Sequence, residues 1–438
     1  MNWSQLISNK RLGQEEVHLE RRDDRTEFNR DYDRLIFSAP FRRLQNKTQV
    51  FPLPGSVFVH NRLTHSLEVA SVGRSLGNDV ARQLISIHPE LASTHISEIG
   101  TIVSTACLAH DMGNPPFGHS GEEAIATYFT EGPGIKYRSM LTDEQWADIT
   151  HFDGNANAFR LLTHQFKGRR KGGFVLTYST LASIVKYPFP ATKAKKQKFG
   201  YFQQEKEVYQ RIASELGLLS ADTSVGMRHP LVYLVEAADD ICYEIMDIED
   251  AHKLKILSFE ETRDLMLGFV PRENHQRIFD HSVDVTDRNE LIVYYRSCAI
   301  GALERECVRV FIENEESILA GTFQGSLISH TCPLVHEAYE RCSKVAFSRI
   351  YKSREVVDIE LAGYKIISTL IEHFTEAVMS PDHAYSRMLL NRISSQYEVD
   401  APDVYQRLMA VLDFLSGMTD VFALDLYRKI NGQSLASV

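Results

Sequence analysis

The 438-residue chain lacks the features that mark membrane, secreted and disulfide-rich proteins. No apolar run reaches the roughly 20 residues that a membrane-spanning helix needs. Residues 1–20 are polar and charged, without the apolar segment and cleavage motif of a secretory signal. Six cysteines are scattered without a CxxC pair, which favours reduced thiols over a disulfide framework or a zinc cluster. We therefore expect a cytoplasmic protein with no membrane partner.

An excess of positive charge is also missing, because the formal net charge is −10. Such a surface does not attract nucleic acid overall. Two basic runs, residues 167–171 and 193–198, could form a local patch, and solvated loop charges explain these runs equally well. Hydrophobic residues make up 43% and charged residues 24%, as in folded globular proteins with a sizeable core.

Apolar residues recur at helical spacing through most of the chain, with no convincing series of strands and no internal repeat. This pattern predicts an all-α protein. We divide it into an N-terminal arm (1–24), poorly packed or docked on a partner subunit, a helical core (25–255), and a C-terminal helical portion (256–438). Residues 168–205 are rich in glycine, lysine and aromatic residues, and we predict an irregular insertion or lid there.

The segment Thr105–Glu122 carries the most distinctive pattern in the sequence. An apolar run ends in the adjacent pair His110 and Asp111, and a glycine and two prolines stop the helix directly after them. At a helix end two neighbouring side chains can converge, and an imidazole beside a carboxylate suits a divalent metal such as manganese, iron, magnesium or zinc. A helix end with a locally satisfied His and Asp is the ordinary alternative for this pair alone.

Other predicted helices could complete a metal site. His65 lies near the start of a long helix that opens at Asn61, and an acid from Glu236–Asp240 lies on the helix Pro230–Asp250. Two imidazoles and two carboxylates would hold a divalent ion with positions left open, and such an ion acidifies a bound water. We therefore predict a metal site made of His65, His110, Asp111 and one of these acids.

Of the two adjacent acids Asp239 and Asp240, we choose Asp239 as the ligand. Tyr243 and Asp247 follow it at i+4 and i+8, so the three side chains share one helix face. That face would bring a phenol and a carboxylate beside the metal, where they could hold a sugar hydroxyl. We assign Asp250 to a solvated face of the same helix.

His119 and Glu122 form a second candidate pair. They are three residues apart at an expected helix start, so each side chain can reach the other. A carboxylate that orients and charges an imidazole is a common way to position a general acid or base. The alternative is a helix capped by Ser120 with an exposed Glu122.

These motifs together resemble those of the HD-domain deoxynucleoside triphosphate triphosphohydrolases. The matching stretches are Arg62-Leu-Thr-His65-Ser, Ala109-His110-Asp111-Met-Gly-Asn-Pro-Pro-Phe-Gly-His119 and Glu236-Ala-Ala-Asp239-Asp240-Ile-Cys-Tyr243. Similar runs at Arg30–Gln45 and Ser416–Asp420 extend the resemblance over most of the chain. Position 114 is Asn where many HD proteins, including phosphodiesterases, place another His, and this departure favours a single metal ion.

The resemblance implies a role for each matching residue. The metal ligands would be His65, His110, Asp111 and Asp239, and the catalytic pair would be His119 and Glu122. The implied substrate-binding residues are Gln49, Arg62, Lys186, Tyr187, Lys198, Tyr243 and Asp247. The cations among them would meet the phosphate chain, and Tyr243 would lie against the deoxyribose, where an added 2′-hydroxyl has no room. Asp247 and Gln49 would bind the 3′-hydroxyl. For Gln49 and Lys198 a plain surface role fits equally well.

The resemblance also implies an HD-domain helical core and a reaction, in which water attacks the α-phosphorus of dGTP, or of another dNTP, and releases the deoxynucleoside and inorganic triphosphate. One divalent ion per subunit is expected, Mn²⁺ or Mg²⁺ first and Fe, Zn, Ni or Co as alternatives. The C-terminal portion would complete the pocket and contribute to a homo-oligomer, a tetramer or hexamer, with a nucleotide or single-stranded DNA as effector. The alternatives are another HD phosphohydrolase, acting on a nucleoside monophosphate, a cyclic nucleotide or a guanosine polyphosphate, and a non-catalytic nucleic-acid-binding regulator.

Overall fold

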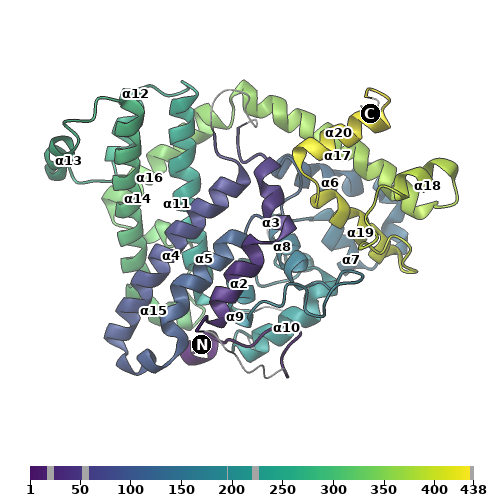
Figure 1. Cartoon of the computed structure of the whole chain (residues 1–438), viewed down its shortest axis with the longest axis horizontal. Coiled ribbons are helices and arrows are strands. Elements are labelled where there is room, and N and C mark those ends of the chain that lie inside the picture. Colours follow the sequence, from purple (N-terminus) through teal and green to yellow (C-terminus); the bar gives the residue numbers. More distant parts are fainter. Residues whose placement is uncertain (17–23, 52–58, 195, 220–225, 435–438) are drawn as a thin grey trace.

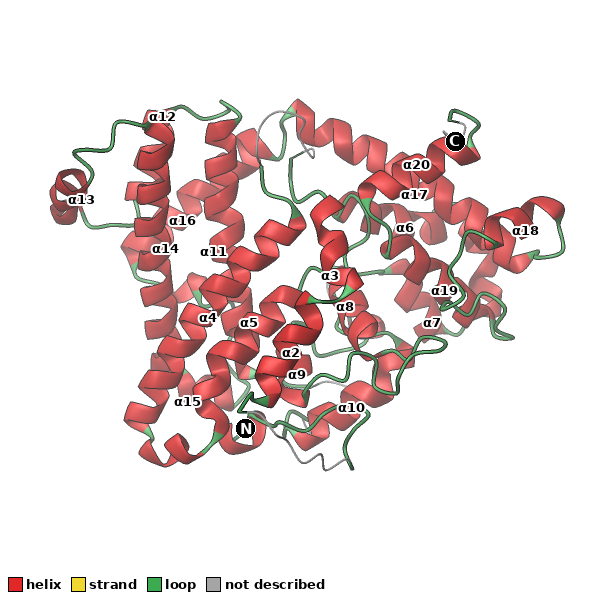
Figure 2. Cartoon of the chain, in the orientation of Figure 1, coloured by secondary structure: helices red, strands yellow, loops and turns green. Residues whose placement is uncertain are grey.

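Every regular element in the described part of the chain is helical (Figure 2), so the all-α prediction is confirmed. Contacts of the strand type are limited there to isolated bridges, such as Thr48 with Asn61. Within the same residues, no helix combines the length and the apolar character needed to cross a membrane. This computed structural model describes residues 1–16, 24–51, 59–194, 196–219 and 226–434.

The helices pack around two hydrophobic cores, and α8 (Gly154–Thr163) contributes to both. The first core is formed by α1 (Trp3–Leu6), α2 (Glu27–Ile36), α3 (Ala39–Arg43), α4 (Arg62–Ile87), α5 (Ile99–Ala109), α9 (Tyr178–Ile184), α10 (Lys206–Glu215), α11 (Pro230–Lys253), α12 (Phe259–Leu267), α13 (His275–His281), α14 (Arg288–Glu313), α15 (Glu315–Leu319) and α16 (Pro333–Val345). The second is formed by α6 (His119–Thr130), α7 (Asp143–Thr150), α17 (Arg354–Met379), α18 (Ala384–Leu390), α19 (Val404–Ser416) and α20 (Asp420–Ile430).

The chain crosses between these two cores. Helices α11 and α14 lie on the left of Figure 1, and α6 lies with α17 and α19 on the right. Helix α6 therefore leaves the neighbours that precede it in sequence and packs mainly against α17, far along the chain. The short loop from α5 to α6 connects the cores, and this loop contains Asp111 and the turn before His119.

Helices α4 and α5 make the closest contact in the first core. A Cβ added to Gly73 would lie 2.6 Å from Cys107 Sγ, and one added to Gly77 would lie 2.7 Å from the Cα of Gly100. Only glycine, which has no side chain, permits the two helices to approach so closely, and the contact does not tolerate even small additions of volume. The contact fixes the C-terminal end of α5, and with it His110, relative to α4.

Two predicted helix starts, at Asn61 and Pro230, are confirmed. The side chain of Asn61 accepts a hydrogen bond from the Thr64 amide and begins α4 with a capping box. Pro230 occupies the first position of α11. The Asp287 side chain accepts hydrogen bonds from two backbone amides at the start of α14, and Pro333 occupies the first position of α16.

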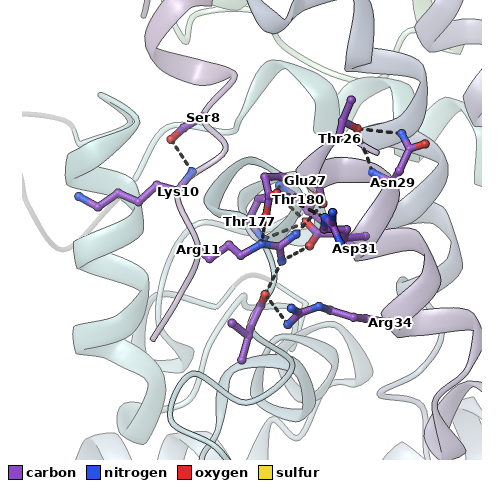
Figure 3. Close-up of polar contacts among 12 residues, drawn as sticks. Ser8, Lys10, Arg11, Thr26, Glu27, Asn29, Asp31, Arg34, Thr177 and Thr180 are labelled. Carbon is purple, nitrogen blue, oxygen red and sulfur yellow. Dashed lines mark hydrogen bonds and ion pairs between the residues drawn. The ribbon is translucent and has the colours of Figure 1, made fainter. Parts of the chain in front are cut away.

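The prediction of a poorly packed arm is wrong for residues 1–16. Trp3 and Leu6 are buried in the first core, and the Arg11 guanidinium forms buried ion pairs with Glu27 and Asp31 of α2 (Figure 3). Isolated anchors of this kind leave no periodic pattern in the sequence, so the composition alone suggested an arm. Residues 17–23 of the predicted arm lie outside the described residues.

The insertion at 168–205 is also more ordered than the sequence predicts. Its centre forms α9, which packs on α5, and Tyr178 and Leu181 are fully buried. An irregular path is present on both sides of this helix. The central part of the insertion therefore belongs to the core and is not a lid.

Candidate active site

Three helices of the first core bring predicted metal ligands together. His65 lies one turn into α4, His110 follows the last residue of α5, and Asp239 lies in the middle of α11. The Asp239 Oδ1 atom is 3.0 Å from His65 Nε2 and 3.5 Å from His110 Nε2. One ligand atom from each residue falls within 4.8 Å of the other two, so one ion could contact all three.

The hydrogen bonds of His110 fit a metal ligand. Its Nδ1 lies 2.6 Å from the Cys107 carbonyl oxygen, a contact in which the nitrogen donates. In the neutral ring the Nε2 atom then carries the lone pair, and this buried atom has no hydrogen-bond partner among the described residues. A ring nitrogen that donates to a carbonyl while the other faces a carboxylate is the arrangement found in metal sites. Two imidazoles and a carboxylate suit manganese, iron or zinc.

Asp111, the fourth predicted ligand, lies at the edge of this group. Its Oδ1 is 3.7 Å from His110 Nε2 and accepts a hydrogen bond from Nδ2 of the Asn114 side chain at 2.5 Å. Its Oδ2 accepts from Arg62 Nη1 at 2.8 Å. The structure therefore brings three predicted ligands into tight contact and places the fourth beside them, oriented by two donors. Asn114 orients a carboxylate at the position where many HD proteins have a His.

The turn that precedes α6 positions His119. Phe117 and Gly118 have positive φ angles of 61° and 56°. A Cβ on Gly118 would overlap the Arg62 guanidinium, so glycine is required both by the backbone angle and by this contact. Arg62 thus lies between the metal ligands and the turn. His119 begins α6 with its side chain 78% exposed, where a substrate can reach it.

The same turn is held by the C-terminal portion of the chain. Asp420 Oδ1 accepts a hydrogen bond from the Phe117 amide at 2.9 Å, and Oδ2 accepts from the Thr48 amide at 2.7 Å. Lys47 Nζ donates to the carbonyls of Asn114 and Ser416 at 2.5 and 2.7 Å. These bonds give the similar stretch Ser416–Asp420 a structural role that the sequence did not reveal.

Glu122 joins His119 to a buried polar network. Its Oε2 lies 3.4 Å from His119 Nδ1 and 3.5 Å from Lys198 Nζ, and its Oε1 accepts from the Gly154 amide at 2.6 Å. The hydrogen bond to Glu122 raises the pKa of His119. Burial opposes the charge on Glu122, but the bonds from His119 and Lys198 outweigh it and lower its pKa. Glu122 is buried, so the alternative of an exposed Glu122 is wrong.

Asp153 is a member of this network that the sequence did not identify. It is fully buried, lies 3.1 Å from Lys198 Nζ, and accepts hydrogen bonds from the amides of Asn155 and Phe199. Burial and the neighbouring charge of Glu122 raise the pKa of Asp153. Asp153 therefore holds Lys198 beside the predicted catalytic pair while it caps α8. Its only sequence signal was a plain N-cap position.

Lys186 approaches the site from the residues that follow α9. Its Nζ is 3.1 Å from Glu236 Oε1, and Arg228 binds the other oxygen of the same carboxylate at 2.7 Å. Burial opposes the charge of Lys186, but Glu236 and other acids of α11 raise its pKa. Tyr187 lies beside it, with its ring centre 5.9 Å from Lys186 Nζ. Lys186 and Lys198 lie in separate ion-pair groups.

Two of the predicted sugar-binding residues, Tyr243 and Asp247, contact Tyr351, which the sequence did not reveal as part of the site. Its hydroxyl donates to Asp247 Oδ2 at 2.8 Å, and its ring stacks on Tyr243 with centres 5.8 Å apart. A π-helical turn, Ala346–Ile350, directly precedes it, and such turns are frequent at functional sites. Burial raises the pKa of Asp247. Gln49 Oε1 is buried without a hydrogen-bond partner, which leaves an acceptor for a ligand.

Asp250 is not on a solvated face, so that assignment is wrong. It is 2% exposed, and its Oδ2 accepts from both the backbone amide and Nδ1 of His60 at 2.8 Å. His60 Nε2 lies 3.1 Å from Glu68. Burial opposes the charge of His60, but the two carboxylates raise its pKa to about 10. This pair fastens the segment before α4 to α11 and so supports His65.

Two protein-family models match parts of the chain. A model of the HD domain matches residues 62–214, and a model of the phosphohydrolase-associated domain matches residues 332–429. The chain is 38% identical to deoxyguanosinetriphosphate triphosphohydrolase-like proteins of Pseudomonas aeruginosa, over the full length of both chains, and of Synechocystis sp., over 99% of this chain and 100% of the relative. It is 30% identical to the deoxyguanosinetriphosphate triphosphohydrolase of Yersinia enterocolitica, over 92% of this chain and 93% of that one. Because these relatives match over more than nine tenths of both chains, the resemblance is confirmed, and the chain belongs to the deoxyguanosinetriphosphate triphosphohydrolase family of HD-domain phosphohydrolases.

Proposed function

We propose that the protein hydrolyses dGTP, or another deoxynucleoside triphosphate, to the deoxynucleoside and inorganic triphosphate with the help of a divalent metal. The observation that carries this proposal is the convergence of His65, His110 and Asp239 next to Arg62, which also contacts the turn before His119. The names of the relatives support the choice of substrate, because they refer to deoxyguanosine triphosphate.

The reaction breaks the bond between the α-phosphorus and the 5′ oxygen while water adds to the phosphorus. A divalent ion bound by the two histidines and Asp239, with Asp111 completing the set, would polarise a phosphate oxygen and acidify water. His119 faces solvent, and its hydrogen bond to Glu122 raises its pKa and so favours the charged ring, which can give its proton to the departing 5′ oxygen. Lys198, held by Asp153, adds positive charge beside the pair.

Substrate binding would use the remaining cations and the α11 face. A triphosphate needs several positive partners besides the metal, and Arg62, Lys186 and Lys198 provide them. Tyr243 would lie against the deoxyribose, and the carboxyl of Asp247 with the free oxygen of Gln49 would bind the 3′-hydroxyl. A ribonucleotide would add a 2′-hydroxyl without room or partner.

The direct test is incubation with each of the four dNTPs and with GTP, with and without Mn²⁺, and chromatographic identification of both products. We expect metal-dependent release of tripolyphosphate, fastest from dGTP and slowest from GTP. Release of pyrophosphate or monophosphate would instead identify another type of HD phosphohydrolase. A fully inactive protein would support the regulator alternative.

The cofactor and the assembly are further parts of the proposal. We propose one Mn²⁺ or Mg²⁺ per chain and a cytoplasmic homo-oligomer, a tetramer or hexamer, that responds to a nucleotide or single-stranded DNA. Metal analysis of the purified protein and its mass in solution test these statements. A metal-free, fully active protein, or a monomer at assay concentration, would contradict them.

A further inference from the structure

A cavity of about 710 Å³ lies behind the loop that carries Asp111. One wall comes from the end of α2 and from α3, another from α8 and residues 164–175, and a third from residues 396–417. None of the predicted metal ligands, and neither residue of the catalytic pair, lines it. Its volume falls within the range of roughly 300–1,000 Å³ that is typical of small-molecule sites.

The cavity is strongly basic. Among the described residues that line it, the only carboxylate is Asp413, and Arg160, outside the lining, binds both of its oxygens at 2.7 Å. The Lys and Arg side chains of the lining are Arg34, Arg43, Lys47, Arg169 and Arg170.

Several of these cations bind neutral oxygens, which satisfy their hydrogen atoms but do not cancel their charge. Arg43 donates to the Gly417 carbonyl at 3.1 Å, and Arg169 donates to Gln396 Oε1 at 3.0 Å. Lys47 is 2% exposed and, within the described part of the chain, donates only to the carbonyls of Asn114 and Ser416. Burial, with the nearby charge of Arg62, lowers the pKa of Lys47 to about 7.

We propose that this cavity binds an oligophosphate chain. Guanidinium groups match phosphate oxygens in geometry as well as in charge, and several lie within one enclosed space here. Two ligands share this chemistry, free tripolyphosphate and a nucleoside triphosphate. The aromatic side chains of Phe37, Phe166 and Tyr397 also line the cavity and could contact a base, and Phe37 is 71% exposed.

The position of the cavity connects its ligand to the active site. Met112 lines it, and Asn157, which also lines it, donates to the Gly113 carbonyl at 2.7 Å. Lys47 binds the carbonyl of Asn114, whose side chain orients Asp111. A phosphate chain bound in the cavity would therefore lie against the loop that carries Asp111, a proposed metal ligand. The statement that tripolyphosphate is also a reaction product rests on the proposed function. The proposal that tripolyphosphate binds in the cavity does not.

The test is calorimetric titration of the full chain with tripolyphosphate in EDTA, which removes divalent ions. The cavity variant is Arg169→Ala/Arg170→Ala, at the exposed mouth. Its control is Arg74→Ala/Lys344→Ala, which removes two exposed positive charges elsewhere. A third variant, Lys186→Ala, weakens the proposed active site instead.

We expect the cavity variant to bind tripolyphosphate at least about tenfold more weakly, a loss of about 1.4 kcal/mol. The charge control and Lys186→Ala should retain a site within about twofold of the original affinity. The proposal fails if the unaltered protein does not bind tripolyphosphate, or if Lys186→Ala abolishes binding and the cavity variant does not. Equal melting temperatures of all variants show that each is folded.

Titrations with dGTP and deoxyguanosine in EDTA separate the two ligands. Tighter binding of dGTP than of tripolyphosphate, lost in the cavity variant, assigns the site to a nucleoside triphosphate. The reverse order assigns it to the free phosphate chain. Binding of deoxyguanosine equal to that of dGTP would overturn the proposal, because the phosphates would then contribute nothing. A protein that binds tripolyphosphate but hydrolyses no dNTP would contradict the proposed function alone.

Discussion

Two buried groups of charged residues in the first core differ in the partners of their carboxylates. Around Arg11, the guanidinium is bonded to Glu27, to Asp31 and to two carbonyls, and Thr177 donates twice to Asp31 (Figure 3). At the predicted metal site, His110 Nε2 has no hydrogen-bond partner, and Asp239 faces two imidazoles. Carboxylates that bind a guanidinium of the same chain indicate a structural role, and a carboxylate beside imidazoles, one of which has an unbonded buried nitrogen, indicates a missing ligand.

The largest expected effect comes from removing a metal ligand. His110→Ala should abolish Mn²⁺ binding and lower kcat/KM by about 1,000-fold or more, because several kcal/mol of charge stabilisation are lost. Calorimetry with Mn²⁺ and a dGTPase assay measure both effects. The control His88→Ala removes a histidine outside the site and should change neither. Unchanged turnover in His110→Ala would show that the metal lies elsewhere.

Removing the guanidinium of Arg11 should affect stability and not metal binding. Arg11→Ala leaves two buried carboxylates without their cation, and we expect a loss of about 3–5 kcal/mol in the free energy of unfolding. Arg25→Ala, in the exposed pair with Asp33, should cost at most about 1 kcal/mol. Urea unfolding gives both values. Equal losses in the two variants would show that the buried ion pairs of Arg11 contribute no more stability than an exposed ion pair.

Glu122→Gln should lower kcat/KM by about 100-fold, because His119 loses the carboxylate that favours its charged form. The hydrogen bond that His119 donates to Glu122 raises the pKa of His119, so the variant should lower that pKa toward its ordinary value. A general acid is active while protonated, so the fall of activity with rising pH should begin at a lower pH in the variant. A pH profile of kcat/KM tests this, and an unshifted profile would separate Glu122 from His119.

The smallest effect concerns the sugar face. Tyr351→Phe removes the hydroxyl that donates to Asp247, an interaction worth about 0.5–1.5 kcal/mol. KM for dGTP should rise a few-fold while kcat stays nearly constant, because the change affects binding of the 3′-hydroxyl. Tyr385→Phe, at an exposed tyrosine, is the control. A fall in kcat without a change in KM would assign Tyr351 another role.

The sequence predicted the parts of the fold and site that depend on local spacing. Helix periodicity, the helix start at Asn61, and the i+4 spacing from Asp239 to Tyr243 are local properties, and they indicated the helices and the shared face. Among contacts between distant segments, only the metal ligands were predicted, from their ligand chemistry and the family resemblance. Other such contacts were not predictable, because nothing in the chain near Asp153 or Tyr351 marks its partner. The burial of Asp250 was missed for the same reason, since its partner His60 lies on another segment.

The hydrogen bond between the Phe117 amide and Asp420 has a consequence for folding during synthesis. The backbone of the turn before His119 is fastened by a carboxylate that is translated some three hundred residues later. During synthesis, the whole HD domain (residues 62–214) is therefore translated before that turn is secured. The site stays unfinished until the start of α20 has emerged from the ribosome. A fragment that ends before α20 would, for the same reason, be a poor isolated module.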